Sequence, residues 1–67
     1  MKNTLKVQRA IHELTQEALA QKAGVSRQTI HAIESGKYVP STVLALKLAR
    51  IFAKPVEALF LLEEKDE

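Results

Sequence analysis

The sequence predicts an all-α fold, a compact bundle of five helices. Helix-favouring residues (Ala, Leu, Glu, Lys and Gln) dominate the composition, whereas Gly and Pro occur only twice each. Gly24, Gly36, Pro40 and Pro55 divide the chain into segments of helical length. No stretch alternates apolar and polar residues for long enough to indicate a strand.

The chain length predicts a single domain over residues 1–67, whose residues 61–67 form a short acidic, dimerising tail. So small a domain buries only about 60% of its unfolded surface, so it needs efficient apolar packing or a partner subunit. Cysteine is absent, and His12 and His31 lie far apart, so we expect no disulfide, metal or cofactor. The longest apolar run, Leu59–Leu62, is too short for a membrane span, and no signal peptide opens the chain. We therefore expect a soluble, cytoplasmic protein.

The charge is unevenly distributed along the chain. Residues 1–56 carry nine Lys and Arg against three acids, a net charge of +6, whereas residues 57–67 carry a net charge of −4. A basic body with an acidic end suits a polyanionic partner for the body, although small soluble domains often carry such charge.

The first helix is expected at about residues 3–13, with Leu5 at its entrance and offset from the main apolar stripe. Apolar side chains recur there at helical spacing and predict the buried face: Val7, Ala10, Ile11 and Leu14. Thr15 can cap the second helix, and Gly24 can end it in the left-handed conformation. Ser26 is placed to cap the third helix, which Gly36 closes in the same way.

The fourth helix begins at Pro40–Ser41 and is apolar around much of its circumference, which predicts the buried centre of the bundle. Pro55 fits the first turn of a fifth helix, where its missing amide costs nothing.

The join between the second and third helices is the most informative feature. Residues 16–35 have the spacing of a helix-turn-helix, with a small Ala20 at the helix crossing and Gly24 at the tight turn. Val25 fills the turn, and Ile30 and Ile33 anchor the third helix on the core. This motif stands at the centre of the predicted bundle.

The side chains between these anchors face outward and include no acid. Arginine pairs with guanine and glutamine with adenine in the major groove, and a short hydroxyl suits a phosphate. A purely structural hairpin could share Ala20 and Gly24 but would not need an acid-free outer face. The outward residues are Arg27, Gln28, Thr29, His31 and Ala32.

The stretch T-Q-E-A-L-A-Q-K-A-G-V-S-R-Q-T-I-H-A-I-E-S-G-K-Y-V-P-S (Thr15–Ser41) resembles the phage-repressor and Cro-type helix-turn-helix family, often called Xre-like. A-L-K-L-A-R-I-F-A-K-P-V-E-A-L-F (Ala45–Phe60) is similar to the last two helices of that family. The resemblance implies a lambda-repressor-like domain whose third helix reads the major groove, and a homodimer on an inverted-repeat operator.

The same resemblance implies roles for single residues. Gln16 matches a phosphate contact, Arg27 and Gln28 match base-reading positions, and Lys37 and Tyr38 match phosphate contacts after the third helix. Gln16 could instead serve only as a helix former, His31 could be simply solvent-exposed, and the Tyr38 ring could pack on the bundle. The full expected DNA-binding set is Gln16, Ser26, Arg27, Gln28, Thr29, His31, Ala32, Lys37 and Tyr38.

Arg9 and Glu34 match a family pair that forms an ion bridge between the first and third helices. Three residues depart from the family pattern. Glu13 replaces Gly at the end of the first helix, so that turn could be built differently. Gln8 replaces a frequent apolar residue, which shifts the packing onto Val7 and Ile11, and Ala53 replaces a common Gly between the last two helices.

We therefore expect a sequence-specific, double-stranded-DNA-binding transcriptional regulator, a repressor, with no small-molecule effector and no membrane partner. No nucleophile with an adjacent base, paired carboxylates or phosphate-binding glycine loop indicates an enzyme. The alternative is a protein-interaction module, such as a DNA-binding antitoxin. That alternative predicts a long C-terminal extension, whereas seven residues follow Phe60.

The homodimer is expected to form through the C-terminal segment, residues Leu59, Phe60, Leu61 and Leu62. On a helix, successive side chains point about 100° apart, so one core cannot take all four. Leu61 or Leu62 would then remain exposed as an interface. Alternatively, these leucines fold back onto Phe52 and Val56, and the protein is a monomer.

Overall fold

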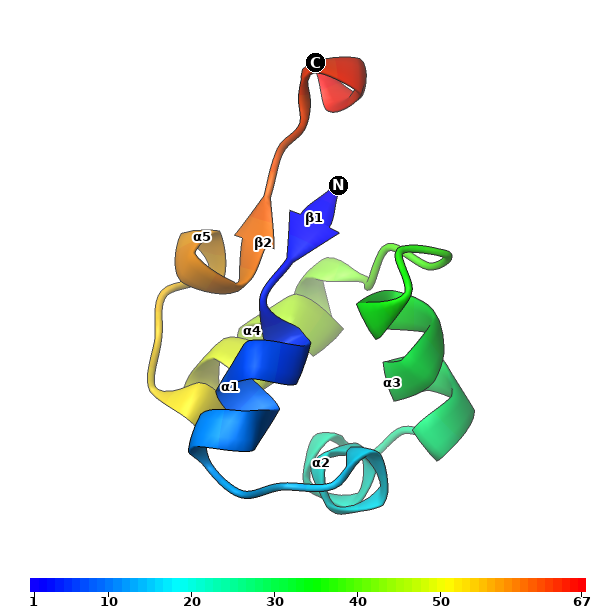
Figure 1. The fold of residues 1–67 in the computed structure, drawn as a ribbon, viewed down its shortest axis with the longest axis vertical. Coiled ribbons are helices and arrows are strands. Elements are labelled where there is room, and N and C mark those ends of the chain that lie inside the picture. Colours follow the sequence, from blue (N-terminus) through cyan, green and yellow to red (C-terminus); the bar gives the residue numbers. More distant parts are fainter.

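The computed structural model describes residues 1–67 and contains five helices and one small antiparallel sheet (Figure 1). The elements are β1 (Lys2–Asn3), α1 (Leu5–Ile11), α2 (Gln16–Ala23), α3 (Arg27–Glu34), α4 (Thr42–Phe52), α5 (Val56–Leu59), β2 (Phe60–Leu61) and a 3-10 turn at Glu64–Asp66. The predicted all-α, five-helix bundle is confirmed, and the sheet is a minor addition to it. No helix is long and apolar enough to cross a membrane.

The starts of α2, α3 and α4 and the end of α2 form where the sequence predicts them. The hydroxyls of Thr15, Ser26 and Ser41 each accept a hydrogen bond from the backbone N–H three residues later, at 3.0, 3.1 and 3.2 Å. Such N-caps satisfy amides that have no partner inside the helix. Gly24, with a φ of 73°, ends α2 in the left-handed region, where a glycine has no steric penalty. These local signals fix both ends of α2 and the starts of α3 and α4.

The core is a single apolar cluster to which every helix contributes. No charged or polar residue belongs to it. Its buried members are Leu5, Leu19, Ala20, Ala23, Ile30, Ile33, Leu44, Leu48, Ala49, Phe52, Leu59 and Phe60.

The predicted buried face of α1 is wrong for Val7, Ala10 and Ile11, which are exposed, whereas Leu14, just after α1, packs against the core. Val7 and Ile11 are 58% and 66% exposed, whereas Leu5 is fully buried. The reason is that Arg9 turns inward to an ion pair with Glu34. Residues two positions apart on a helix point about 200° apart, so an inward Arg9 directs both Val7 and Ile11 outward. The packing that was expected of Val7 and Ile11 is supplied mainly by Leu5.

The expectation that α4 is the buried centre is wrong for half of the helix. Leu44, Leu48 and Phe52 pack into the core, but Val43 and Leu46 are 64% and 57% exposed. These two residues lie on the side of α4 that no other helix covers, because the bundle surrounds only one face of α4.

The C-terminal apolar run is not one helix, which corrects the geometry predicted for residues 59–62. Pro55 is the N-cap of α5, which has only one turn, and Phe60 already has extended backbone (φ −125°, ψ 126°). Strand β2 then pairs with β1, with Lys2 opposite Leu61 and Asn3 opposite Phe60. Leu59 and Phe60 finish the core, and Leu61 and Leu62 are 44% and 70% exposed.

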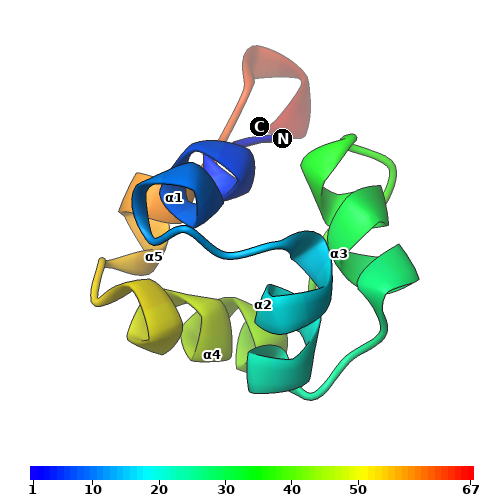
Figure 2. The same cartoon turned by 60° about the horizontal axis from the view of Figure 1, so that its bottom comes forward.

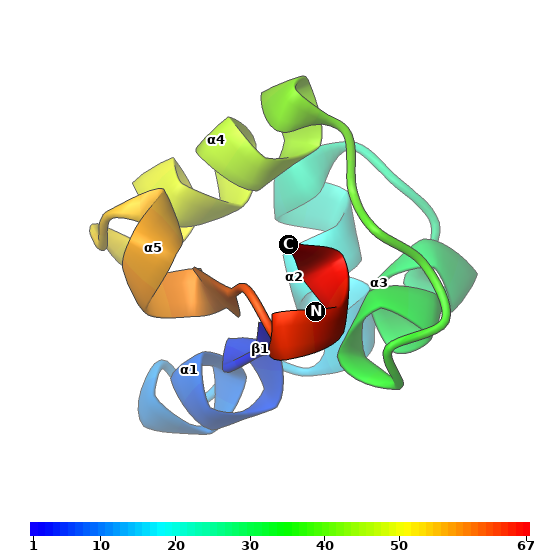
Figure 3. The same ribbon diagram turned by 90° about the horizontal axis from the view of Figure 1, so that it is seen from above.

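The acidic tail returns to the first residue of the chain. Carboxylate oxygens of Glu63 and Asp66 lie 2.9 and 3.0 Å from the Met1 ammonium, and Figure 3 shows the two chain ends close together. The tail is therefore tied to the residue that precedes β1.

Candidate nucleic-acid interface

Helices α2 and α3 are joined by a tight turn that fixes their relative orientation. Ala20 and Ala23 of α2 are each only 1% exposed, so small side chains stand where the helices approach. The Val25 N–H donates a hydrogen bond to the Ala20 carbonyl oxygen at 3.0 Å, which closes the turn. Figure 2 shows the resulting arrangement, with α3 beside α2 on the outside of the bundle. The geometry is that of a helix-turn-helix.

Helix α3 has a buried face and a polar outer face. Ile30 and Ile33 are 0% and 1% exposed and hold α3 on the core. Arg27, Gln28 and His31 are exposed, and Thr29 and Ala32 are half-buried. These five predicted contact residues thus share an accessible surface that includes no carboxylate.

Ser26 caps α3, as the sequence predicts, and it is also one of the predicted DNA contacts. Its hydroxyl accepts from the Thr29 N–H at 3.1 Å and lies 3.0 Å from the Thr29 hydroxyl. The Ser26 side chain therefore caps α3 and holds the Thr29 side chain in position.

An ion pair joins α1 to α3 below the outer face. Two nitrogens of the Arg9 guanidinium, Nε and Nη2, donate to the Glu34 carboxylate at 2.6 and 3.1 Å, and Nη1 donates to the Leu14 carbonyl at 2.9 Å. The Arg9 and Glu34 side chains are 15% and 6% exposed. A paired, two-pronged contact of this kind is stronger than a single charged hydrogen bond.

Gln16 belongs to the same network. Its Nε2 donates to a Glu34 oxygen at 3.1 Å and lies 3.4 Å from Nδ1 of His31. Burial by itself raises the pKa of the Glu34 carboxyl, but hydrogen bonds from Arg9 and Gln16 outweigh it and hold that pKa below its usual value. The network therefore connects two predicted DNA-contacting residues to the anchored carboxylate.

The loop after α3 carries the remaining predicted contacts. Gly36 has a φ of 78°, and the Lys37 N–H donates to the Ala32 carbonyl at 2.9 Å, so the loop folds back on α3. Lys37 is exposed. Tyr38 is 47% exposed and borders a hollow of about 280 Å³ together with Thr29. The structure thus places both residues close to the outer face of α3.

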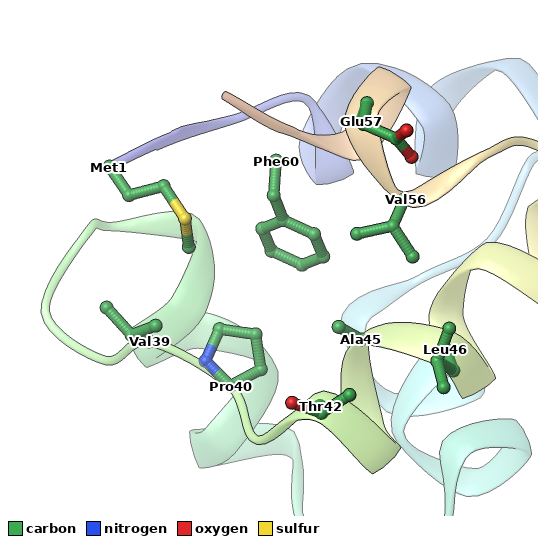
Figure 4. A pocket seen from close by; sticks show the side chains of 9 residues that line it. All are labelled: Met1, Val39, Pro40, Thr42, Ala45, Leu46, Val56, Glu57 and Phe60. Carbon is green, nitrogen blue, oxygen red and sulfur yellow. The ribbon is translucent and has the colours of Figure 1, made fainter. Parts of the chain in front are cut away.

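The predicted dimer residues lie near an apolar cleft that the sequence reading missed. Leu59 is fully buried and cannot form an interface, whereas Phe60 forms one wall of a cleft of about 460 Å³ (Figure 4). The missed residues include Val39 and Leu46, which are 63% and 57% exposed. Helical periodicity could have indicated Leu46, because it lies away from the stripe formed by Leu44 and Leu48. The full lining is Met1, Val39, Pro40, Thr42, Ala45, Leu46, Val56, Glu57 and Phe60.

The fold and the outer face of α3 define a helix-turn-helix DNA-binding protein. The family described as Helix-turn-helix matches residues 5–59, a span from the start of α1 to the end of α5. The chain belongs to this family and is a DNA-binding transcriptional regulator.

Relatives of known sequence and structure agree with this assignment. An HTH-type transcriptional regulator of Methanocaldococcus jannaschii is 58% identical over 98% of this chain and 100% of its own length. YgzD, an HTH-type transcriptional regulator of Bacillus subtilis, is 48% identical over the same shares of the two chains. The restriction-modification controller protein C.AhdI from Aeromonas hydrophila is similar in structure, with a TM-score of 0.76 and 34% identity. That similarity covers 84% of this chain and 85% of C.AhdI.

Proposed function

We propose that this regulator is a repressor that binds an inverted-repeat DNA operator as a homodimer in the cytoplasm and reads each half-site with α3. The observation that carries the proposal is the acid-free outer face of α3, which lies opposite the buried Ile30 and Ile33. A helix held in this way can enter the major groove, with its N-terminal residues nearest the base edges.

The positions of the side chains divide the contacts into two kinds. Arg27 and Gln28 begin α3 and are exposed, so they are suited to bidentate contacts with base edges. His31 and Ala32 lie one turn further along the helix, where Ala32 can meet a thymine methyl group. The surrounding residues Gln16, Lys37 and Tyr38 are suited to phosphate contacts, which fix the position of the helix without reading sequence.

The homodimer is supported by the apolar cleft and the exposed leucines beside it. Leu62 follows β2 directly, two residues after Phe60 at the cleft wall, and is 70% exposed. Exposed apolar surface on a small domain typically marks an interface. A symmetric contact between two copies buries the surface on both, and it holds two α3 helices about 34 Å apart, one turn of DNA.

Selection of bound sequences from random duplex DNA tests the proposal. We expect an inverted repeat whose half-site centres are about 10 base pairs apart. Gel shifts at two salt concentrations should show weaker binding at high salt, because phosphate contacts release counterions. A reporter gene with the selected operator in its promoter should lose expression when the protein is present. Recovery of no preferred sequence would contradict the reading function, and raised expression would contradict repression.

A further inference from the structure

Three basic side chains gather behind the turn between α2 and α3. Lys22 lies near the end of α2, and Lys47 and Arg50 lie one helical turn apart on α4. All three are exposed and border one hollow of about 300 Å³ together with Gln21 and Gly24. We call this surface the basic hollow. None of its cations takes part in an ion pair, and no Asp or Glu borders it.

The basic hollow adjoins a second hollow that lies on the expected DNA-contacting side of α3. The second hollow, of about 280 Å³, is bordered by Thr29 and Tyr38, which belong to the expected DNA contacts. Lys47 and Ala23 border both hollows. A phosphate backbone that passes Thr29 and Tyr38 therefore meets Lys47 next, and then Lys22 and Arg50. We propose that the basic hollow binds phosphates of duplex DNA beyond the base pairs that α3 reads, an inference that rests on the proposed function.

The distribution of charge over the molecule favours a polyanionic occupant. Figure 1 shows α2 and the acidic tail at opposite ends of the molecule, whose longest dimension is 32 Å. The single carboxylate beneath α3, that of Glu34, is already paired with Arg9. No Asp or Glu borders the basic hollow, so its positive potential is not cancelled within it, and a concave protein surface of one charge sign concentrates such a potential.

Stabilisation of helix ends explains only part of this cluster. Lys22 and Arg50 lie in the last turns of α2 and α4, where a cation interacts favourably with the helix dipole. Lys47 lies one turn earlier on α4 and makes no such contribution. Since Lys47 is also the side chain that borders both hollows, it is the residue that distinguishes DNA binding from helix stabilisation.

The test compares two duplexes that contain the selected operator. One ends at the edges of the operator, and the other extends about 10 base pairs, one helical turn, beyond each edge. We expect wild-type protein to bind the extended duplex more tightly and with a steeper salt dependence. Replacing both cations of α4 (Lys47→Gln with Arg50→Gln) should weaken binding to the extended duplex roughly tenfold at moderate salt. The slope of log K against log salt should fall by about two, because each lost phosphate contact removes about 0.9 of slope.

The controls separate the inference from the proposed function. Lys2→Gln removes one positive charge from β1, at the acidic end, as Lys47→Gln removes one from α4, and it should leave both duplexes bound as by wild type. Lys47→Gln alone should lower the salt slope on the extended duplex by about one without changing the preferred sequence. An unchanged slope in the double variant, or an equal loss in Lys2→Gln, would overturn the inference while the proposed function stands. Failure of wild-type protein to bind any duplex would overturn both.

Discussion

At the level of single residues, two turns place a residue other than glycine in the left-handed backbone region. Glu13, between α1 and α2, has a φ of 54°, and Ala53, after α4, has a φ of 53°. These are the two positions where the family resemblance implies Gly, so the turns keep their backbone although the residue differs. A residue with a Cβ is strained in this region by roughly 1–2 kcal/mol. Both turns therefore reduce the free energy of unfolding.

Replacing Ala53 with Gly should stabilise the protein. We expect Ala53→Gly to raise the free energy of unfolding by about 0.5–1 kcal/mol, because relief of strain exceeds the entropy that glycine gains in the unfolded chain. Ala10→Gly is the matched control, since Ala10 is exposed within α1 and should lose about 1 kcal/mol. Urea unfolding monitored by circular dichroism measures both. A lower midpoint for Ala53→Gly would show that this turn is unstrained.

At the scale of elements, the Arg9–Glu34 pair determines how α1 sits on α3. It is the contact that turns Arg9 inward and Val7 and Ile11 outward. We expect a double-mutant cycle with Arg9→Met and Glu34→Gln to give a coupling free energy of about 1–3 kcal/mol. The two single changes together should lower the free energy of unfolding by more than the double change does, because a single change leaves the partner partly buried without its pair. Strictly additive losses would show that the interaction between Arg9 and Glu34 does not contribute to stability.

The same pair should make stability depend on pH. The folded pKa of Glu34 lies below its usual value of 4.5, so the folded state holds the proton less tightly than the unfolded state does. This contribution to stability is complete above about pH 4.5 and is lost as pH falls through the folded pKa. Thermal melts between pH 7 and pH 3 should show this loss in the wild type, and Glu34→Gln should reduce it. An identical pH dependence in Glu34→Gln would contradict the assignment.

The elements that the sequence predicts best are those set by local signals. Thr15 and Ser26 cap their helices as expected, and Ser41 caps the helix that was expected to begin there, because an N-cap depends on a few neighbouring residues. The face of α1 depends instead on Glu34, which is remote in sequence, and the sheet pairs residues 2–3 with residues 60–61. No periodicity within one segment contains such contacts. For the same reason, the outer face of α3 was predictable from its own residues, whereas the apolar cleft and the basic hollow were not.

At the scale of the whole molecule, the apolar cleft should hold the second copy. Leu62→Glu is expected to yield a folded monomer, because Leu62 is 70% exposed and contributes little to the core. Ile11→Glu is the matched control, since Ile11 is 66% exposed on α1 and should leave the dimer intact. Analytical ultracentrifugation at tens of micromolar measures both variants. Wild-type protein that sediments as a monomer would contradict the dimer.

The proposed function requires that α3 reads bases and that the residues around it bind phosphates. Measured affinities of Arg27→Ala and Lys37→Ala for the selected operator and for random duplex test it most directly. Arg27→Ala should cost about 1–3 kcal/mol on the operator, should leave binding to random duplex nearly unchanged, and should relax the preference at one base pair. Lys37→Ala should weaken binding to both duplexes alike and lower the salt slope by about one. If Arg27→Ala loses the same affinity on random duplex as on the operator, α3 does not read the bases through Arg27.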